Sequence, residues 1–158
     1  MGDFAQFYGE HSDRVLRAIY VCTRDRQLAD DAVSEAFARA FSRWGTVQQH
    51  PEPVAWVTRT AINVARSSWR HRARTRTGAI PERSYAEDDP IDPVLVDAVL
   101  SLPERQRQVV GLRVLLDLST EQTAQILRIA PGTVTAHLHR ALTALRNDLA
   151  QTQEGADL

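Results

Sequence analysis

The chain has 158 residues, and its 19 basic side chains are all arginine; 20 acidic side chains bring the formal net charge to −1. That length suits one domain of ordinary size or two small ones. Its longest apolar runs are a few residues, far short of the roughly 20 needed to span a bilayer, and its first residues lack the basic and apolar regions of a secretory signal. The single cysteine, Cys22, excludes an internal disulfide and a cysteine-rich metal site. Together these features predict a cytoplasmic protein without membrane insertion.

Apolar residues recur at steps of three and four along the first 44 residues, the spacing of amphipathic helices. One stripe runs from Phe4 to Cys22 and a second from Ala29 to Trp44, with the polar segment 23–26 between them. Gly45 is the residue type expected just past a helix C-terminus. The sequence therefore predicts two helices joined by a tight connection.

Residues 46–53, TVQQHPEP, predict a loop because two prolines interrupt them. Pro53 suits the first turn of a third helix, which carries Val57 and Ala61 inward and runs into an arginine-rich stretch. Residues 66–76 hold five arginines and no acid, whereas residues 77–100 hold six acids and one arginine. Local fields, rather than the whole-chain pI of about 6.5, therefore decide whether the chain binds polyanions.

Residues 77–93 are rich in proline and acids and predict a linker. Beyond it, Ser101–Glu104 and Ser119–Gln122 have the spacing of capping boxes that start two further helices, and a turn over 128–132 precedes a last helix that ends near residue 149. Because no segment alternates with the strand period, the predicted fold is all-α. It has a three- to four-helix domain over 1–76, a linker over 77–93, a four-helix domain over 94–150 and a disordered tail over 151–158.

Residues 119–146 predict a helix-turn-helix, since a short helix, a turn of about four residues and a longer helix follow one another. One side of the last helix is apolar: Val134, Leu138, Ala141, Leu142 and Leu145. The recognition face, as we call the other side, consists of Thr133, Thr135, Ala136, His139 and Arg140. Its hydroxyl, imidazole and guanidinium groups suit phosphates and base edges in the major groove of DNA. An ordinary solvated helical hairpin would show the same periodicity.

The third helix carries aromatic, arginine and amide side chains on a face distinct from its apolar one. This basic face consists of Trp56, Arg59, Asn63, Arg66, Trp69 and Arg70. Aromatic rings stack on exposed bases and arginines neutralise phosphates, so the pattern favours single-stranded DNA. The alternative is that Trp56 belongs to the core and that the arginines form a solvated helix end.

Asp31 and Glu35 share one face of the second helix at i,i+4 spacing. Like charges at that spacing cost a few tenths of a kcal/mol, which predicts the approach of a basic partner. The helix macrodipole explains acids near a helix start equally well.

The chain has no Gly-rich phosphate loop, HExxH motif or nucleophile elbow, and His137 and His139 do not share a helix face. The sequence thus predicts no enzyme, catalytic residue, cofactor or metal site.

Three segments in this order, ADDAVSEAFARAFSRW, PVAWVTRTAINVARSSWRHR and LPERQRQVVGLRVLLDLSTEQTAQILRIAPGTVTAHLHRAL, resemble the extracytoplasmic-function sigma factors of bacterial RNA polymerase. The resemblance covers about residues 3–148. It implies an N-terminal domain that binds the polymerase clamp and the −10 promoter element, and a C-terminal domain that binds the polymerase flap and the −35 element.

At residue level, the resemblance implies clamp contacts from Asp31, Glu35 and Arg39 and −10 contacts along Trp56 to Arg70. It further implies capture of a flipped base by the loop Gly45–Pro53 and −35 contacts from the recognition face. In the clamp motif Ala32 and Ser34 replace the usual Leu and Gln. Ala130 stands where a Ser usually caps the recognition helix, a loss worth about 1 kcal/mol.

The resemblance makes core polymerase and promoter DNA the partners of this chain, and a monomer is the simplest oligomeric state. An anti-sigma factor is a possible further partner, which would hold the two domains packed together with their DNA faces hidden. Two alternatives remain open from the residues alone. One is a stand-alone helix-turn-helix regulator that binds duplex DNA as a dimer, and the other is a helical adaptor that binds only protein.

Overall fold

The structure is a computed structural model that describes residues 2–75 and 92–156. Within these two ranges the chain consists of helices and their connections, so the predicted all-α fold is confirmed. The chain divides into two compact units, the first ending at Ser84 and the second beginning at Tyr85. Of the linker predicted over 77–93, all but the last two residues lie outside the described ranges. No helix in those ranges combines the length and apolarity that a membrane span requires.

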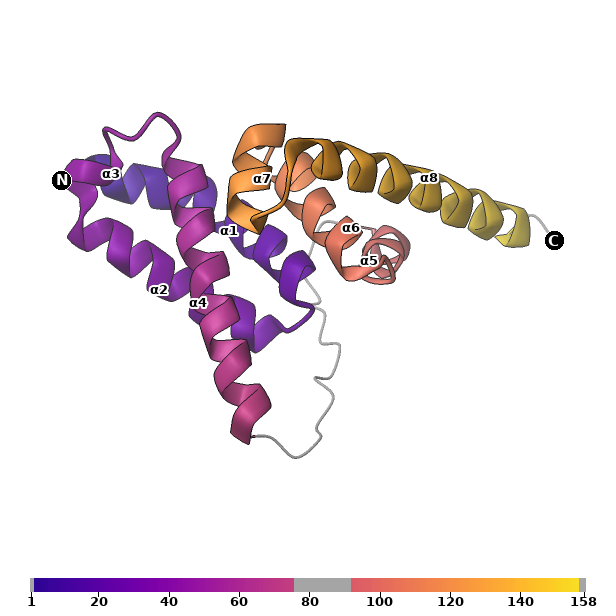
Figure 1. The fold of residues 1–158 in the computed structure, drawn as a ribbon, viewed down its shortest axis with the longest axis horizontal. Coiled ribbons are helices and arrows are strands. Elements are labelled where there is room, and N and C mark those ends of the chain that lie inside the picture. The colour runs from indigo at the N-terminus through magenta and orange to yellow at the C-terminus, as the bar shows by residue number, and fades with distance from the viewer. Residues whose placement is uncertain (1, 76–91, 157–158) are drawn as a thin grey trace. The chain divides into compact units, whose positions relative to one another are not determined.

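The first unit contains α1 (Gly2–Thr23), α2 (Arg26–Ser42), the short α3 (Trp44–Val47) and α4 (Pro53–Thr75). The second helix, α2, packs against both α1 and α4, and Figure 1 shows α4 crossing the other two. The chain reverses between α1 and α2 at Arg24, whose φ of 56° is left-handed. Asp25 then caps α2, because its carboxylate accepts the N–H of Leu28 at 3.0 Å.

The core of the first unit comes from the predicted apolar stripes. Many of its residues are small, which lets the three long helices approach closely. The side chains with no exposed surface include Val15, Ala18, Ile19, Ala29, Ala32, Ala36, Ala40, Val57 and Ala61.

The connection predicted as a loop over 46–53 contains a helical turn, α3, so that prediction is wrong for its first two residues. Val47 is fully buried, and the Trp44 ring meets the Phe4 ring edge-on with centroids 5.4 Å apart. These two apolar anchors hold the chain against the unit before the first proline is reached. The remaining connection is closed by His50, whose Nδ1 accepts the N–H of Glu52 at 3.0 Å.

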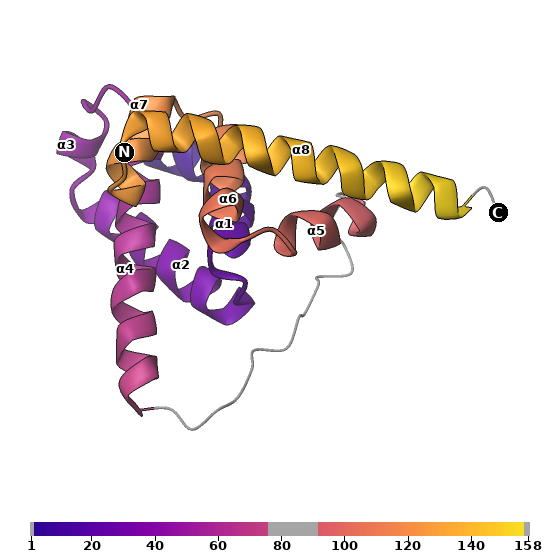
Figure 2. The ribbon, with the colours of Figure 1, turned by 45° about the vertical axis from the view of Figure 1, so that its right-hand side comes forward.

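The second unit contains α5 (Pro93–Leu100), α6 (Glu104–Val110), which continues as the π-helical η1 (Gly111–Leu115), α7 (Thr120–Leu127) and α8 (Pro131–Ala156). Helices α5, α6 and α7 all pack against α8, and the views of Figure 1 and Figure 2 agree that they succeed one another along it. One core cluster of this unit joins α8, through Ala141 and Leu145, to Val110 of α6 and to Leu102 in the connection before α6.

The predicted capping box at Ser101–Glu104 is wrong. Ser101 ends α5, with its hydroxyl donating to the carbonyl of Asp97 at 2.7 Å. The next helix starts at Glu104 with Pro103 before it at φ −54° and ψ 149°. The proline ring fixes φ, and the extended ψ makes Pro103 the last non-helical residue. Pro103 thereby takes the capping position from Ser101.

Two further predictions for this unit need correction. Leu142 is 42% exposed rather than part of the inward face, because it lies about 100° around the helix from the fully buried Ala141. Of the tail predicted to be disordered over 151–158, residues 151–156 are helical, since no glycine or proline lies between Gly132 and Gly155; the last two residues lie outside the described range. Thr152 supports these turns by donating to the carbonyl of Asp148 at 3.0 Å.

Candidate nucleic-acid interface

Helices α7 and α8 and the turn between them form the predicted helix-turn-helix. The capping box at its start is confirmed: the Ser119 hydroxyl accepts the N–H of Gln122 at 3.0 Å, and the Gln122 side-chain oxygen accepts the N–H of Ser119 at 2.8 Å. Arg128 ends α7 in the left-handed conformation, with φ 59° and ψ 45°. Ala130 opens α8, because its carbonyl accepts the N–H groups of Thr133 and Val134 at 3.0 and 3.1 Å.

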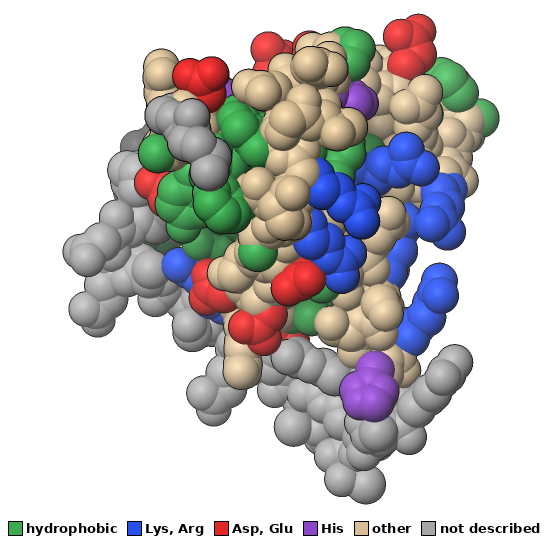
Figure 3. Space-filling view, turned by 90° about the vertical axis from the view of Figure 1, so that its left-hand side faces the viewer, with side chains coloured by type: hydrophobic (Ala, Val, Ile, Leu, Met, Phe, Trp, Pro, Cys, Tyr) green, Lys and Arg blue, Asp and Glu red, His purple; other side chains and the backbone are tan. Residues whose placement is uncertain are grey.

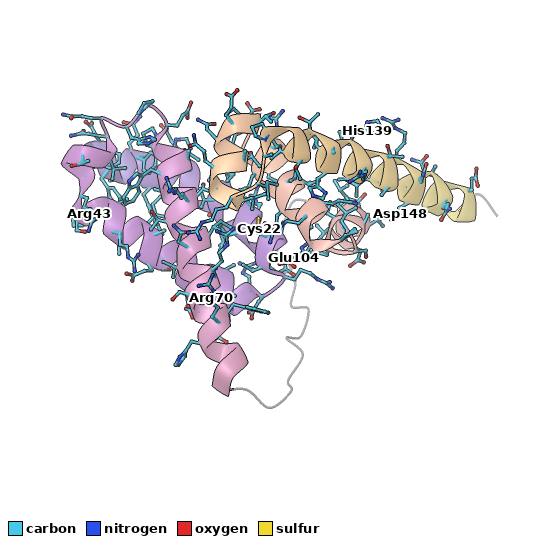
Figure 4. All side chains as sticks on the ribbon, in the orientation of Figure 1. Cys22, Arg43, Arg70, Glu104, His139 and Asp148 are labelled. Atoms are coloured by element: carbon cyan, nitrogen blue, oxygen red, sulfur yellow. The ribbon has the colours of Figure 1, made fainter. Side chains whose placement is uncertain are left out.

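The recognition face of α8 points away from the core of its unit. Thr133, Thr135, His139 and Arg140 are exposed and Ala136 is half-buried, whereas Val134 on the other side of the helix is fully buried. Figure 4 shows His139 on the side of α8 opposite to α5 and α6. Residues 133–140 include no acid, so this face offers hydrogen-bond donors and positive charge to a polyanion.

The basic face of α4 is divided by its burial. Arg59, Asn63, Trp69 and Arg70 are exposed, and Trp69 is 64% exposed, whereas Trp56 and Arg66 are half-buried. Basic side chains gather in a band on the side of the molecule seen in Figure 3, and Figure 4 shows Arg70 well down the length of α4. Because Trp56 is half-buried, it is neither a core residue nor a ring that is fully accessible to a base.

The opposite side of α4 anchors the helix in its unit. Val57, Thr58 and Ala61 are fully buried there. The Thr58 hydroxyl donates to the carbonyl of Val54 at 2.7 Å, so it is buried with a partner. The buried side of α4 therefore fixes the orientation of its exposed face relative to the rest of the unit.

Asp31, Glu35 and Arg39 form an exposed row on α2. Glu35 pairs with Arg39, with Oε1 and Nε 2.9 Å apart. The acid therefore already has a basic partner, which the arginine at i+4 spacing in the sequence indicates. The macrodipole explanation for Asp31 is wrong, because it is the sixth residue of a helix that begins at Arg26 and the effect fades within the first turn.

Asp31 lines a hollow of about 510 Å³ between α2 and α4. Its other lining residues are Leu28 from α2 and Ser67, Ser68 and His71 from α4. A carboxylate at the edge of a polar hollow can receive a cationic side chain from a partner. In the parts of the chain that the structure describes, no three His, Cys, Asp or Glu side chains gather as metal ligands would.

Two arginines that sequence reasoning did not single out tie the helix-turn-helix to the helices before it. Arg113 Nη1 donates to the carbonyl of Leu118 at 2.6 Å, just before the capping box. Arg105 Nη1 lies 3.4 Å from the carbonyl of Leu127, which is 22 residues away in the chain. No periodicity links residues at such a separation, so only the structure reveals the second contact.

The sequence matches two described families in chain order: Sigma-70 region 2 over residues 7–75 and Sigma-70 region 4 over residues 94–145. It is 33% identical over 152 residues to an RNA polymerase sigma-E factor of Streptomyces coelicolor, covering 93% of this chain and 86% of that protein. It is 32% identical over 161 residues to the ECF RNA polymerase sigma factor SigL of Mycobacterium tuberculosis, covering 91% of this chain and 87% of that protein.

Solved structures share the fold. The sigma factor RpoE of Bartonella quintana, crystallised with the anti-sigma factor NepR, matches with a TM-score of 0.77 at 20% identity, covering 95% of this chain and 98% of that one. CnrH, solved with the cytosolic domain of CnrY, matches with a TM-score of 0.58 at 18% identity, covering 94% of this chain and 88% of that one.

Proposed function

The chain belongs to the extracytoplasmic-function sigma factors of the sigma-70 family, and from that membership we propose which of its residues do the work. It is a transcription initiation factor that directs core RNA polymerase to promoters. The observation that carries this conclusion is the match to region 2 and region 4 in family order, one match in each unit. Sigma factors are not themselves the catalysts of transcription. We assign this chain no covalent step, a place in the cytoplasm and a monomeric state.

We propose that residues 94–150 place the recognition face of α8 over the −35 duplex and bind the polymerase flap. Four exposed polar side chains on one face, with no acid among them, support this role. Arg140 carries the strongest donor set, because a guanidinium can bind a phosphate or the O6 and N7 atoms of guanine with two hydrogen bonds. The half-buried Ala136 leaves room for a base edge to approach.

In the same proposal residues 1–76 hold the separated strand of the −10 element along the basic face of α4. Arg59 and Arg70 neutralise phosphates, and the exposed ring of Trp69 offers a surface on which a base can stack. The loop before α4 captures a base turned out of the duplex. Turning out a base costs a few kcal/mol, which these contacts offset.

The polymerase contact is assigned to the row of Asp31, Glu35 and Arg39, with Asp31 as its centre. Asp31 is exposed and borders the hollow between α2 and α4, whereas the charge of Glu35 is already balanced by Arg39. A basic side chain of the polymerase clamp would thus bind Asp31 first.

The acidic linker over 77–93 would lie in a basic channel of the enzyme, since its negative charge repels duplex DNA. An anti-sigma factor remains a possible partner of the free chain.

Run-off transcription tests the function. Core RNA polymerase is incubated with sheared genomic DNA of the source organism, with and without the chain, and the RNA 5′ ends are mapped. A sigma factor yields new start sites that share sequence elements upstream. A stand-alone helix-turn-helix regulator would instead bind a palindromic duplex without polymerase, and a protein-only adaptor would change neither result. The absence of new start sites would overturn the assignment.

A further inference from the structure

A side chain of α6 reaches the turn of the helix-turn-helix. Arg105 Nη1 lies 3.4 Å from the carbonyl of Leu127 and 3.1 Å from Oε1 of Gln108. One terminal nitrogen of a guanidinium carries two N–H bonds, so each acceptor has one. Glu104 orients the amide of Gln108, because Gln108 Nε2 donates to Glu104 Oε1 at 3.2 Å. These three side chains of α6 form a hydrogen-bonded row that ends on the last carbonyl of α7.

The turn needs such an outside contact for two reasons. The last carbonyls of a helix have no partner within it. The carbonyl of Ala124 accepts the N–H groups of Arg128 and Ile129. The carbonyl of Leu127 is the one that Arg105 approaches. Arg128 also adopts φ 59°, a conformation that glycine accepts readily and that side chains with a Cβ disfavour. The turn is therefore held by its contacts rather than by the preference of its own residues.

We propose that Arg105 is a positioning residue for promoter recognition: it fixes the end of α7 against α6 and so sets the direction in which α8 leaves the turn. The proposal rests on the proposed −35 role of α8. Only Arg128, Ile129 and Ala130 separate α7 from α8, so movement of the last turn of α7 shifts Thr133 and Thr135. Base contacts carry sequence specificity, whereas phosphate contacts carry affinity that does not depend on sequence. Loss of Arg105 should thus lower discrimination more than affinity.

The test uses the full chain with core polymerase on a promoter found by the genomic experiment and on the same promoter with its −35 element scrambled. Arg105→Met keeps an unbranched side chain of about the length of the arginine stem but removes the guanidinium and its donors. Arg146→Met removes the same charge from an exposed position of α8. We expect the transcription ratio between the two templates to fall about tenfold in Arg105→Met and to be kept in Arg146→Met, and Arg105→Lys to recover part of it because an ammonium can donate to Leu127.

Two readouts separate positioning from other roles. If Arg105 bound a phosphate, Arg105→Met would lower the slope of log affinity against log salt by about one; we expect an unchanged slope. The second readout is the double variant Arg105→Met, Arg128→Gly, in which glycine relieves the left-handed turn. If Arg105 only stabilised the unit, this variant would recover both the melting temperature and the transcription ratio between the two templates. We expect the ratio to stay low, with Arg128→Gly alone as the reference.

An unchanged ratio in Arg105→Met, a lowered salt slope, or recovery of the ratio in the double variant would each overturn the proposal. Failure of the proposed function gives a different result. In that case the unaltered chain would start no RNA with core polymerase from either template, and no ratio could be formed.

Discussion

Glu35 and Arg39 form an ion pair across one turn of α2, with 2.9 Å between Oε1 and Nε. Asp31, one turn earlier on the same face, lines the hollow between α2 and α4 instead. The two acids therefore differ in what they offer to a partner. A pair of this kind on an exposed helix contributes about 0.3–0.5 kcal/mol. Glu35 thus meets a polymerase as half of a neutral pair, and Asp31 as a carboxylate.

Reversal of the charge at Asp31 should abolish binding to core polymerase. Asp31→Arg places a cation where the clamp is proposed to present one, so pull-down of core polymerase with the variant should fail. The matched control is Asp30→Arg, because Asp30 is the neighbouring exposed acid but points about 100° away and lies 3.5 Å from Arg26. Equal binding by both variants would move the docking surface elsewhere on the unit.

Glu35→Gln should weaken polymerase binding less than Asp31→Asn. The substitution removes a charge that Arg39 already balances, and the free energy of unfolding should fall by no more than about 0.5 kcal/mol. Competition of each variant with the unaltered chain for a limiting amount of core polymerase measures the order. A larger loss for Glu35→Gln would mean that the partner breaks the internal pair and binds Glu35 itself.

Arg140→Ala should weaken transcription that depends on the −35 element and leave polymerase binding intact. The change removes a guanidinium from the exposed face of α8 without touching the core, and loss of one good base contact costs about 1–3 kcal/mol, or roughly five- to 150-fold. Run-off transcription from a matched and a −35-scrambled template gives the comparison. A variant with full output on the matched template would remove Arg140 from the recognition face.

Ser119→Ala should destabilise the second unit by about 1 kcal/mol, since it removes one arm of a capping box. Ser101→Ala should cost less, because the Ser101 hydroxyl only donates back to a carbonyl of its own helix. Urea unfolding followed by circular dichroism measures both. All three tryptophans, Trp44, Trp56 and Trp69, lie in the first unit, so their fluorescence transition should stay in place. The opposite order would restore the capping role to Ser101.

The two serines also show how far the sequence could lead. Helices and their buried faces follow from the spacing of apolar residues, and the sequence predicts the cap at Ser119 correctly because no neighbouring residue competes for that position. At Ser101 the spacing was equally good, but Pro103 lies inside the motif and fixes the helix start. The spacing of residues thus predicts a cap wrongly where a neighbouring residue, here Pro103, determines where the helix starts.

The recognition face could be predicted because it is one side of one helix. Contacts between elements could not, since Arg105 and Leu127 are 22 residues apart and the burial of Val47 that makes α3 depends on the packing of the whole unit. Leu142 marks the same limit: it belongs to the apolar pattern, yet it is 42% exposed because the helices that cover α8 leave that side open.

Trp69→Ala should impair promoter opening without lowering stability. The ring is 64% exposed, so its removal takes little from the core, while a base that stacks on an aromatic ring gains about 1–3 kcal/mol. Trp56→Ala should affect both properties, because that ring is half-buried. Permanganate reactivity of thymines in the −10 region, measured with the variant bound to core polymerase, reports opening, and thermal unfolding followed by tryptophan fluorescence reports stability. If Trp69→Ala opened the promoter normally, the basic face of α4 would hold phosphates alone. If it lowered the melting temperature as much as Trp56→Ala, Trp69 would be a structural residue.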